Sequence, residues 1–347
     1  MRGPRKVPAR YFVQLCDWLR GQGTDTEALL RIANIDVSKI HHSQAQLEPE
    51  EVDAFVTNAH RLVGRGDLGF ELGRLINMTS HDLLGYGMLG CRNFDEMLRL
   101  VARHYHLMTE TFTLRYQRGS AGAGEAIYTP ALTMRLQTLR FYLEALAVAH
   151  DNQLRQMLPH GMRGTWDIYM SMSAPEHLAR YSALPQVRFH FDEAFPPGVR
   201  VVMPASVLEH PLPFTNPRMV KEIDRLCANQ AHRPRRASQD WVAYLRMMLS
   251  HVDGETPTLE SIAENNCVSP RTIERYLRQE NVSFRELLHQ ARFERACELL
   301  GNPLVTVAHI AQRLGFTDAA NFSRAFRRVI GTTPTAYRQR VQASECE

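Results

Sequence analysis

The sequence lacks the features that mark membrane proteins, secreted disulfide-rich domains and zinc modules. No apolar run approaches the ~20 residues that span a bilayer. The basic N-terminus is followed by polar and charged residues instead of the apolar core of a signal peptide. The six cysteines form no CxxC pair and have no histidine at zinc-finger spacing, so reduced, buried thiols are expected. We therefore expect a cytoplasmic protein with no membrane contact, cofactor or metal.

Signatures of catalysis are also missing. The sequence has no GxSxG, GxGxxG or Walker motif. His41-His42 and His104-Tyr-His106 have no carboxylate or cysteine at a spacing that completes a metal site, so ordinary surface or core histidines are expected. Six aromatic residues could line a ligand cavity, although such spacing is more often plain core: Tyr105, Phe112, Tyr116, Tyr128, Phe141 and Tyr142.

Lysine is scarce, and the positive charge is carried by arginine. Only Lys6, Lys39 and Lys221 are lysines, and the formal net charge of the chain is +4. Between Cys267 and Arg340, however, there are twelve arginines and only six acidic residues. This local excess is larger than that of the whole chain and indicates a polyanionic partner.

The length of 347 residues suggests two domains at ~150 residues each. Hydrophobic periodicity in the first part predicts helices and strands together, that is, a mixed α+β domain. The expected helices are Tyr11–Leu19, Ala28–Ile35, Val52–Val63, Asn93–Met108 and Thr133–Leu158. The expected strands are Thr111–Tyr116, Glu125–Tyr128, Trp166–Met172, Val187–Phe191 and Val199–Met203.

Proline-rich and basic segments then separate this domain from a helical one. Pro211–Pro217 is punctuated by three prolines, a short helix is expected over Met219–Asn229, and Gln230–Ala237 is polar, basic and broken by proline. We therefore expect a domain over residues 1–212, a linker region over 213–237 and an all-α domain over 238–347.

The last third contains a weak internal repeat. One copy runs from Ile262 to Arg278 and the other from Ile310 to Arg327, with an offset of 48 residues that becomes 49 in the second half of each copy. Each copy reads as a short helix, a tight turn and a second helix. Between the copies, the capping box Ser283–Glu286 opens a long helix that ends before Gly301.

The second helix of each copy is expected to have one core face and one polar face. Ile273 and Leu277 lie one turn apart, as do Phe322 and Phe326. The outward positions are Arg271, Glu274, Arg275 and Arg278 in the first copy and Ala320, Ser323, Arg324 and Arg327 in the second, with Arg328 beside them. Arginine can fork onto guanine or grip phosphate. A solvated arginine-rich face would explain either copy alone, but the repetition favours DNA binding.

This last third of the sequence resembles the paired helix-turn-helix domain of AraC/XylS regulators. The resemblance covers about Asp240 to Arg340 and is closest from Ile310 to Arg338. It implies that the second helix of each unit is a recognition helix and that the long helix is a rigid connector. The base-reading positions of the family match Arg271, Glu274 and Arg275 in the first unit and Ala320, Ser323 and Arg324 in the second. Cys267 stands in the turn where the family usually has glycine.

The first domain resembles the long effector domain called "arabinose-binding" in one branch of that family. Leu84–Tyr105 carries this resemblance, and Val187–Phe191 and Leu208–Pro213 fit the end of that domain. The label does not imply that arabinose is the ligand. The resemblance implies a transcriptional regulator that senses a small-molecule effector and self-associates. We expect a homodimer that works with RNA polymerase at double-stranded promoter DNA as an activator, although the sequence leaves activator and repressor both open.

Two alternatives to an effector-controlled regulator remain open at this point. A regulator without a ligand, controlled by a partner protein or by abundance, differs only in whether a pocket exists. An enzyme is not expected, because DNA-repair alkyltransferases fused to this DNA-binding type need a reactive cysteine in a Pro-Cys-His-Arg setting. None of the six cysteines has that context.

Overall fold

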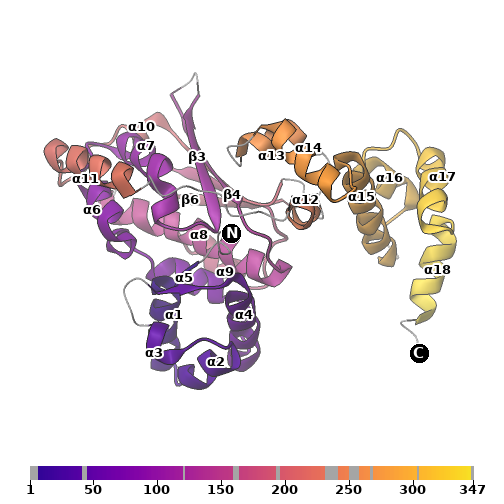
Figure 1. The fold of residues 1–347 in the computed structure, drawn as a ribbon, viewed down its shortest axis with the longest axis horizontal. Coiled ribbons are helices and arrows are strands. Elements are labelled where there is room, and N and C mark those ends of the chain that lie inside the picture. Colours follow the sequence, from indigo (N-terminus) through magenta and orange to yellow (C-terminus); the bar gives the residue numbers. More distant parts are fainter. Residues whose placement is uncertain are drawn as a thin grey trace. The chain divides into compact units, whose positions relative to one another are not determined.

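The computed structural model describes residues 7–40, 45–119, 122–158, 164–192, 196–230, 241–249, 258–265, 269–302 and 305–344. These residues fall into two compact units, one ending at Gln230 and the other beginning at Trp241 (Figure 1). The first unit combines helices with a sheet, and the described part of the second is entirely helical. The predicted fold class, an α+β domain followed by an all-α domain, is confirmed.

Five helices gather at one side of the first unit (Figure 1). They are α1 (Arg10–Gly21), α2 (Thr26–Ile32), α3 (Val37–Ile40), α4 (Pro49–Val63) and α5 (Leu68–Leu75), accompanied by the short strand pair β1 (Val7–Pro8) and β2 (Gln46–Leu47). Local chemistry sets their starts: Asp25 accepts a hydrogen bond from the backbone at the start of α2, and a capping box of Glu48 and Glu51 opens α4. Phe12 and Phe55 meet edge to face in their core.

A five-stranded sheet forms the other layer of this unit. Its strands are β3 (Phe112–Arg118), β4 (Gly124–Pro130), β5 (Trp166–Met170), β6 (Val187–Phe191) and β7 (Val199–Met203), in the order β3-β4-β7-β5-β6. All neighbours are antiparallel except β5 and β6, which are joined through α9 (Leu178–Ser182). The alternation of buried residues on β5 and β7 turns one face of the sheet toward the core.

Helix α8 (Leu136–Met157) lies between the two layers. Phe141, Ala145 and Ala149 pack with the helices, whereas Leu143 and Ala147 pack with the sheet. The long helix therefore belongs to both hydrophobic cores, which is why it is buried around most of its circumference.

The remaining elements cover the side of the sheet core. They are η1 (Met78–His81), α6 (Asp82–Gly90), α7 (Phe94–His104), η2 (Tyr105–Leu107), α10 (Ala205–Leu208) and α11 (Pro217–Gln230). Helix α11 packs against α6 and α7, and its residues Val220, Ile223 and Cys227 are buried in the sheet core. The region predicted as a linker from residue 213 thus contains a helix of the first unit. The boundary expected at residue 212 falls inside this packing unit.

The five predicted strands are confirmed, two of them residue for residue, Val187–Phe191 and Val199–Met203. Helices α5 and α6 were missed because each carries two or more glycines, which disfavour isolated helices. Contacts with other helices compensate for this. A Cβ on Gly73 would lie 2.6 Å from the Cβ of Val148, so glycine allows α5 and α8 to approach closely.

The second unit contains the repeat. Its helices are α12 (Trp241–Leu249), α13 (Leu259–Asn265), α14 (Pro270–Gln279), α15 (Phe284–Gly301), α16 (Val307–Arg313), α17 (Ala319–Ile330) and α18 (Pro334–Ser344). The predicted capping box of Ser283 and Glu286 is present at the start of α15. Helix α15 contacts α12 on one side and α16, α17 and α18 on the other, so it connects the two copies.

Candidate DNA-binding face and effector cavity

The four short helices of the repeat begin with the same device. Thr258 and Ser269 start the helices of the first copy, and Thr306 and Asp318 start those of the second. Each side-chain oxygen accepts a hydrogen bond from the backbone N–H three residues later, at 3.1, 3.2, 3.2 and 2.7 Å respectively. The threonines are 48 residues apart and the other two caps 49, so the copies match in structure as they do in sequence.

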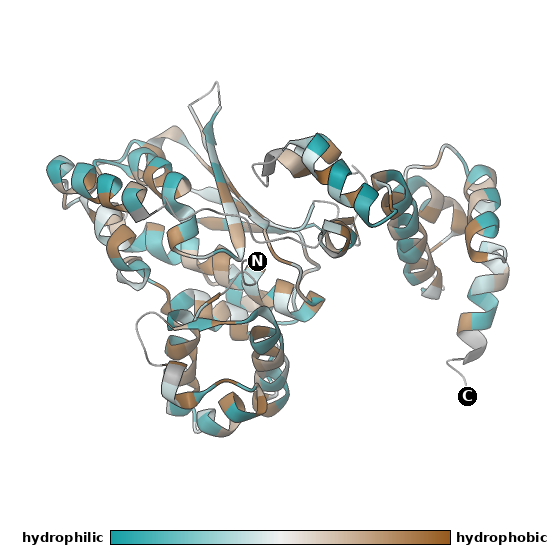
Figure 2. Ribbon diagram, viewed as in Figure 1, coloured by the Kyte–Doolittle hydropathy of each residue, from teal (hydrophilic) through white to brown (hydrophobic). Residues whose placement is uncertain are grey.

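The core positions of the second helices also match. Ile273 and Leu277 of α14 and Phe322 and Phe326 of α17 are all buried. Phe326 packs edge to face against Phe293 of the connecting helix, with ring centroids 6.1 Å apart. Both helices are amphipathic, with hydrophilic and hydrophobic residues alternating along them in Figure 2. The opposite face of each helix is therefore free of the core.

On α14, the four predicted outward residues are exposed. They are Arg271, Glu274, Arg275 and Arg278. Glu274 and Arg278 form a loose ion pair of 3.6 Å between groups that are both well exposed, so this pair holds the arginine only weakly. The face thus carries three guanidinium groups and one carboxylate.

On α17, Ala320, Arg324, Arg327 and Arg328 are exposed, and Ser323 is half-buried. The hydroxyl of Ser323 donates to the carbonyl of Ala319 at 2.7 Å, which turns this side chain back along its own helix. The guanidinium of Arg324 donates to the side-chain oxygen of Asn321 at 2.5 Å. Ser323 is therefore the predicted site residue least available to an outside partner.

The turns of the two copies differ in what can be described. Gly315, in the turn of the second copy, has a φ of +74°, a left-handed conformation that suits glycine. The corresponding position of the first copy, Cys267, lies outside the described residues.

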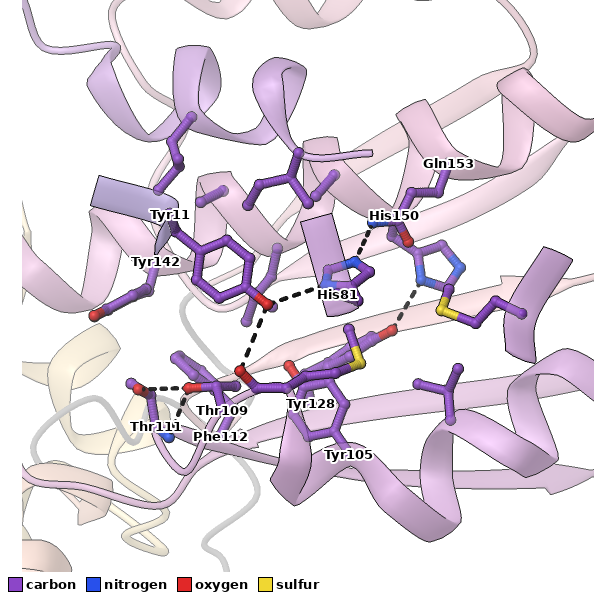
Figure 3. Close-up of a pocket in the computed structure, with 18 of the residues that line it drawn as sticks. Tyr11, His81, Tyr105, Thr109, Thr111, Phe112, Tyr128, Tyr142, His150 and Gln153 are labelled. Atoms are coloured by element: carbon purple, nitrogen blue, oxygen red, sulfur yellow. Dashed lines mark hydrogen bonds between the residues drawn. The ribbon is translucent and has the colours of Figure 1, made fainter. Parts of the chain in front are cut away.

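The first unit contains a cavity of about 90 Å³ where its two hydrophobic cores meet (Figure 3). Its wall is formed by α1, α5, η1, α6, α7, η2, β3, β4 and α8, with one residue of β1 and the loop between η2 and β3. The lining residues are Val7, Tyr11, Leu72, Ile76, His81, Met88, Met97, Leu98, Val101, Tyr105, Met108, Thr109, Thr111, Phe112, Tyr128, Tyr142, Ala145, Leu146, Ala149, His150, Gln153 and Leu154. Among these described residues, none is Asp, Glu, Lys or Arg.

A chain of hydrogen bonds crosses one side of the cavity (Figure 3). Gln153 Nε2 lies 2.7 Å from His81 Nε2, and His81 Nδ1 lies 3.0 Å from the hydroxyl of Tyr11. The Tyr11 hydroxyl in turn donates to the carbonyl of Met108 at 3.5 Å. Burial, and secondarily the nearby Arg10 guanidinium, lowers the pKa of His81 to about 3. A neutral imidazole that accepts from Gln153 and donates to Tyr11 satisfies every member of the chain.

The second histidine of the wall is only half satisfied. His150 Nδ1 lies 2.9 Å from the hydroxyl of Tyr128, whereas His150 Nε2 is buried and has no hydrogen-bond partner among the residues that the structure describes. Burial lowers the pKa of His150 to about 4, so the ring is neutral at physiological pH. One nitrogen of a buried imidazole on the cavity wall is therefore left unpaired.

Comparison with known proteins now identifies the chain. Residues 23–212 match the model of the arabinose-binding domain of AraC transcription regulators, and residues 262–340 match a helix-turn-helix domain. The chain belongs to the AraC family of transcription regulators. It is thus a DNA-binding transcriptional regulator with an effector-type N-terminal domain, as the sequence predicted.

Its relatives are regulators over nearly the full length. The chain is 24% identical over 333 residues to the ornithine utilization regulator of Pseudomonas aeruginosa, covering 96% of each chain. It is 26% identical over 329 residues to an uncharacterized HTH-type transcriptional regulator of Mycobacterium tuberculosis, covering 94% of each. Among solved structures, it is similar to the regulator CdpR of Pseudomonas aeruginosa, with 19% identity, a TM-score of 0.42, and coverage of 90% of this chain and 96% of that one.

Only four of the six aromatic residues considered as cavity-lining candidates line the cavity of this AraC-family regulator. Tyr105, Phe112, Tyr128 and Tyr142 line the cavity. Tyr116 instead donates to Asp95 at 2.7 Å, and Phe141 stacks on Phe12. Plain core, the commoner outcome for such residues, therefore describes only some of them. The polar members of the wall were missed, because Tyr11, His81 and Gln153 come from three distant segments and share no local pattern.

The histidine pairs form no metal site in the described chain. No group of three or more His, Cys, Asp or Glu side chains could hold a metal among the residues that the structure describes. His104 bonds instead to Asp224, and His41 and His42 lie outside the described residues. None of the helices in the described part of the chain combines the length and the apolar character that crossing a bilayer requires.

Proposed function

We propose that this regulator binds promoter DNA with α14 and α17 in two adjacent major grooves, and that Arg275 and Arg324 occupy equivalent places there. The observation that carries this proposal is the match between the copies: cap, buried pair and exposed arginine all recur at an offset of 49 residues. Two recognition helices on one face of a duplex should lie about one helical turn, ~34 Å, apart along the DNA.

The other exposed residues have distinct expected roles. Arg271 and Glu274 reach base edges next to Arg275, and Ala320 offers a methyl contact to thymine. Arg278, Arg327 and Arg328, toward the far ends of the helices, contact phosphates. Ser323 contributes least, because its hydroxyl is already bonded within α17.

The N-terminal cavity supports control by a small molecule. An effector acts only if it binds one arrangement of the protein better than another. The usual coupling of 1–3 kcal/mol gives a graded response in DNA affinity. We also propose that the N-terminal unit carries the contact of a homodimer, which would present four recognition helices to a promoter with two sites and to RNA polymerase.

The test of the DNA-binding face uses the full chain and an operator selected from random duplexes. Arg275→Ala and Arg324→Ala should each weaken binding by about 5- to 150-fold, corresponding to ~1–3 kcal/mol. Arg31→Ala removes an exposed arginine of the other unit and should leave affinity unchanged. Native affinity in both helix variants would overturn the assignment of the two recognition helices.

A further inference from the structure

The chemistry of the cavity wall restricts what it can hold. The described wall contains no Asp, Glu, Lys or Arg. Both of its histidines are neutral, because burial lowers their pKa values. An ion placed in such a site would lose its hydration without gaining a counter-charge, which is costly in an apolar environment. A zwitterionic or cationic metabolite is therefore excluded from this cavity.

A polyhydroxylated ligand fits no better. Each of its hydroxyls would need a partner once water is removed. The polar groups of the wall are largely bonded to one another: Gln153, His81 and Tyr11 form one closed chain, and the Thr109 hydroxyl donates to that of Thr111 at 2.9 Å. Sugars would have to break these bonds or leave most of their own hydroxyls unpaired.

Two polar atoms of the wall are buried without a hydrogen-bond partner among the described residues, the Tyr142 hydroxyl and His150 Nε2. The Tyr142 hydroxyl points away from Tyr11 and His81 in Figure 3, so His150 Nε2 is the polar position left for a ligand. His150 Nε2 is buried and unpaired on the wall, and it can act as donor or acceptor depending on which nitrogen carries the proton. A ligand hydroxyl can accept from or donate to this nitrogen in either tautomer. The opening therefore matches a molecule with a single hydroxyl group.

The rest of the wall favours a compact apolar body. Two pairs of aromatic rings pack edge to face. The ring centroids of Tyr105 and Tyr128 are 5.6 Å apart, and those of Phe112 and Tyr142 are 5.8 Å apart. A volume of about 90 Å³ exceeds the ~10–15 Å³ that one water needs but is smaller than the ~150 Å³ of a cavity known to bind benzene. The flexible side chains of Met88, Met97 and Met108 can repack to admit a six-membered ring.

We infer that the effector is an uncharged monohydroxylated molecule about the size of one ring, such as a simple phenol or cyclic alcohol, with its hydroxyl on His150. This inference rests on the proposed effector function of the cavity and names the ligand class. It separates this chain from the relative named for ornithine utilization, because ornithine carries charges that this wall does not match.

The test is thermal unfolding of the full chain with a panel of probes: phenol, cyclohexanol, benzene, benzoate, ornithine and arabinose. At ten times its Kd, a binder should raise the Tm of the N-terminal unit by about 3–6 °C. Phenol and cyclohexanol should stabilise the unit, with phenol binding about 2- to 13-fold more tightly than benzene, which is the worth of one net hydrogen bond. Benzoate, ornithine and arabinose should have no effect.

Two variants assign binding to the cavity. His150→Phe should remove the preference for phenol over benzene, while Tyr116→Phe, which changes a tyrosine outside the wall, should keep it. Ala149→Leu should fill the space and abolish binding of both. The thermal shifts of the native chain alone already decide the ligand class if a variant fails to fold.

The outcomes separate the ligand class from the proposed function. Stabilisation by benzoate, ornithine or arabinose that Ala149→Leu abolishes would overturn the neutral class but keep the cavity as the effector site. Stabilisation by phenol that survives both Ala149→Leu and His150→Phe would place the ligand elsewhere and overturn the inference. No stabilisation by any probe would also overturn it, whereas operator binding by the same protein would still report on the DNA-binding face.

Discussion

The imidazole Nε2 of His104 lies 2.6 Å from a carboxylate oxygen of Asp224, and this contact joins α7 to α11. Arg103 donates to the other oxygen of the same carboxylate, also at 2.6 Å. Tyr105, the residue after His104, lines the cavity. Helix α11 is the last described element of the first unit and precedes α12 and the helix-turn-helix units along the chain. The pair therefore connects the cavity wall to the helix that leads out of the effector domain.

Removing this carboxylate should loosen α11. A hydrogen bond to a charged group contributes ~1.5–3 kcal/mol, but the Asp224 side chain is 33% exposed, so we expect Asp224→Asn to cost only about 1 kcal/mol. The Tm of the N-terminal unit should fall by about 2–4 °C. The change in operator affinity that the effector causes should shrink more than the operator affinity measured without effector.

Glu222→Gln is the matched control on the same helix. Glu222 pairs with Arg225, but both side chains are more than half exposed, and such pairs contribute almost nothing. An equal loss of stability and of effector response in the two variants would show that the His104–Asp224 contact has no special role.

Close packing of α5 on α8 should make Gly69 and Gly73 intolerant of side chains. A Cβ on Gly73 would lie 2.8 Å from the carbonyl oxygen of Ala145, and one on Gly69 would overlap the carbonyl oxygen of Phe141. We expect Gly69→Ala to destabilise the unit by ~1–3 kcal/mol through overpacking, despite the better helix propensity of alanine. Gly21→Ala, with open space around its Cβ, should be neutral. Equal Tm values for the two variants would contradict this packing argument.

These glycines also show where sequence reasoning reached its limit. The helix-turn-helix units could be predicted because their signals are local: Ser269 and Asp318 cap their helices with neighbouring residues, and the repeat fixes the register. Helix α5 could not be predicted in this way, because Gly69 and Gly73 are poor helix formers. Packing against α8, which depends on these glycines, compensates for their low propensity.

The cavity was unpredictable for a related reason. Its polar members, such as Tyr11 and His81, are 70 residues apart and meet only when the helical layer docks on α8 and the sheet. The helix α11 was expected in sequence, but its attachment was not, because the burial of Ile223 against Gly87 is a tertiary contact. Local periodicity reveals that a helix forms, and not which domain it joins.

The stability of the N-terminal unit should fall as the pH is lowered from about 6 to 4. His81 and His150 have folded pKa values of about 3 and 4, below the ~6.5 of an unfolded histidine. In this window the unfolded chain takes up two protons that the folded state excludes. Burial raises the pKa of Asp151 to about 6, above the unfolded value of ~3.9, so this group alone has the opposite effect. The unfolded chain therefore binds about one proton more than the folded chain. The free energy of unfolding should fall by about 1.4 kcal/mol for each pH unit.

Urea unfolding of the full chain at several pH values measures this slope. His150→Gln removes one of the two excluded protons, so the stability of the variant should vary little between about pH 6 and 4. The exposed His309→Gln should keep the native slope. A His150→Gln slope as steep as that of the native chain would mean that His150 is protonated in the folded state.

Salt dependence should distinguish the phosphate contacts from the base contacts. Operator affinity of the full chain should fall with rising salt, and the logarithmic slope should change by about 0.9 for each phosphate contact that is lost. Arg328→Ala should reduce the slope by about one contact and weaken operator and random DNA alike. Arg275→Ala should instead reduce the preference for the operator over random DNA, because a base contact carries sequence information and a phosphate contact does not. If Arg328→Ala left the slope unchanged, this arginine would not contact phosphate. If Arg275→Ala weakened operator and random DNA equally, the helix α14 would grip the backbone without reading the bases.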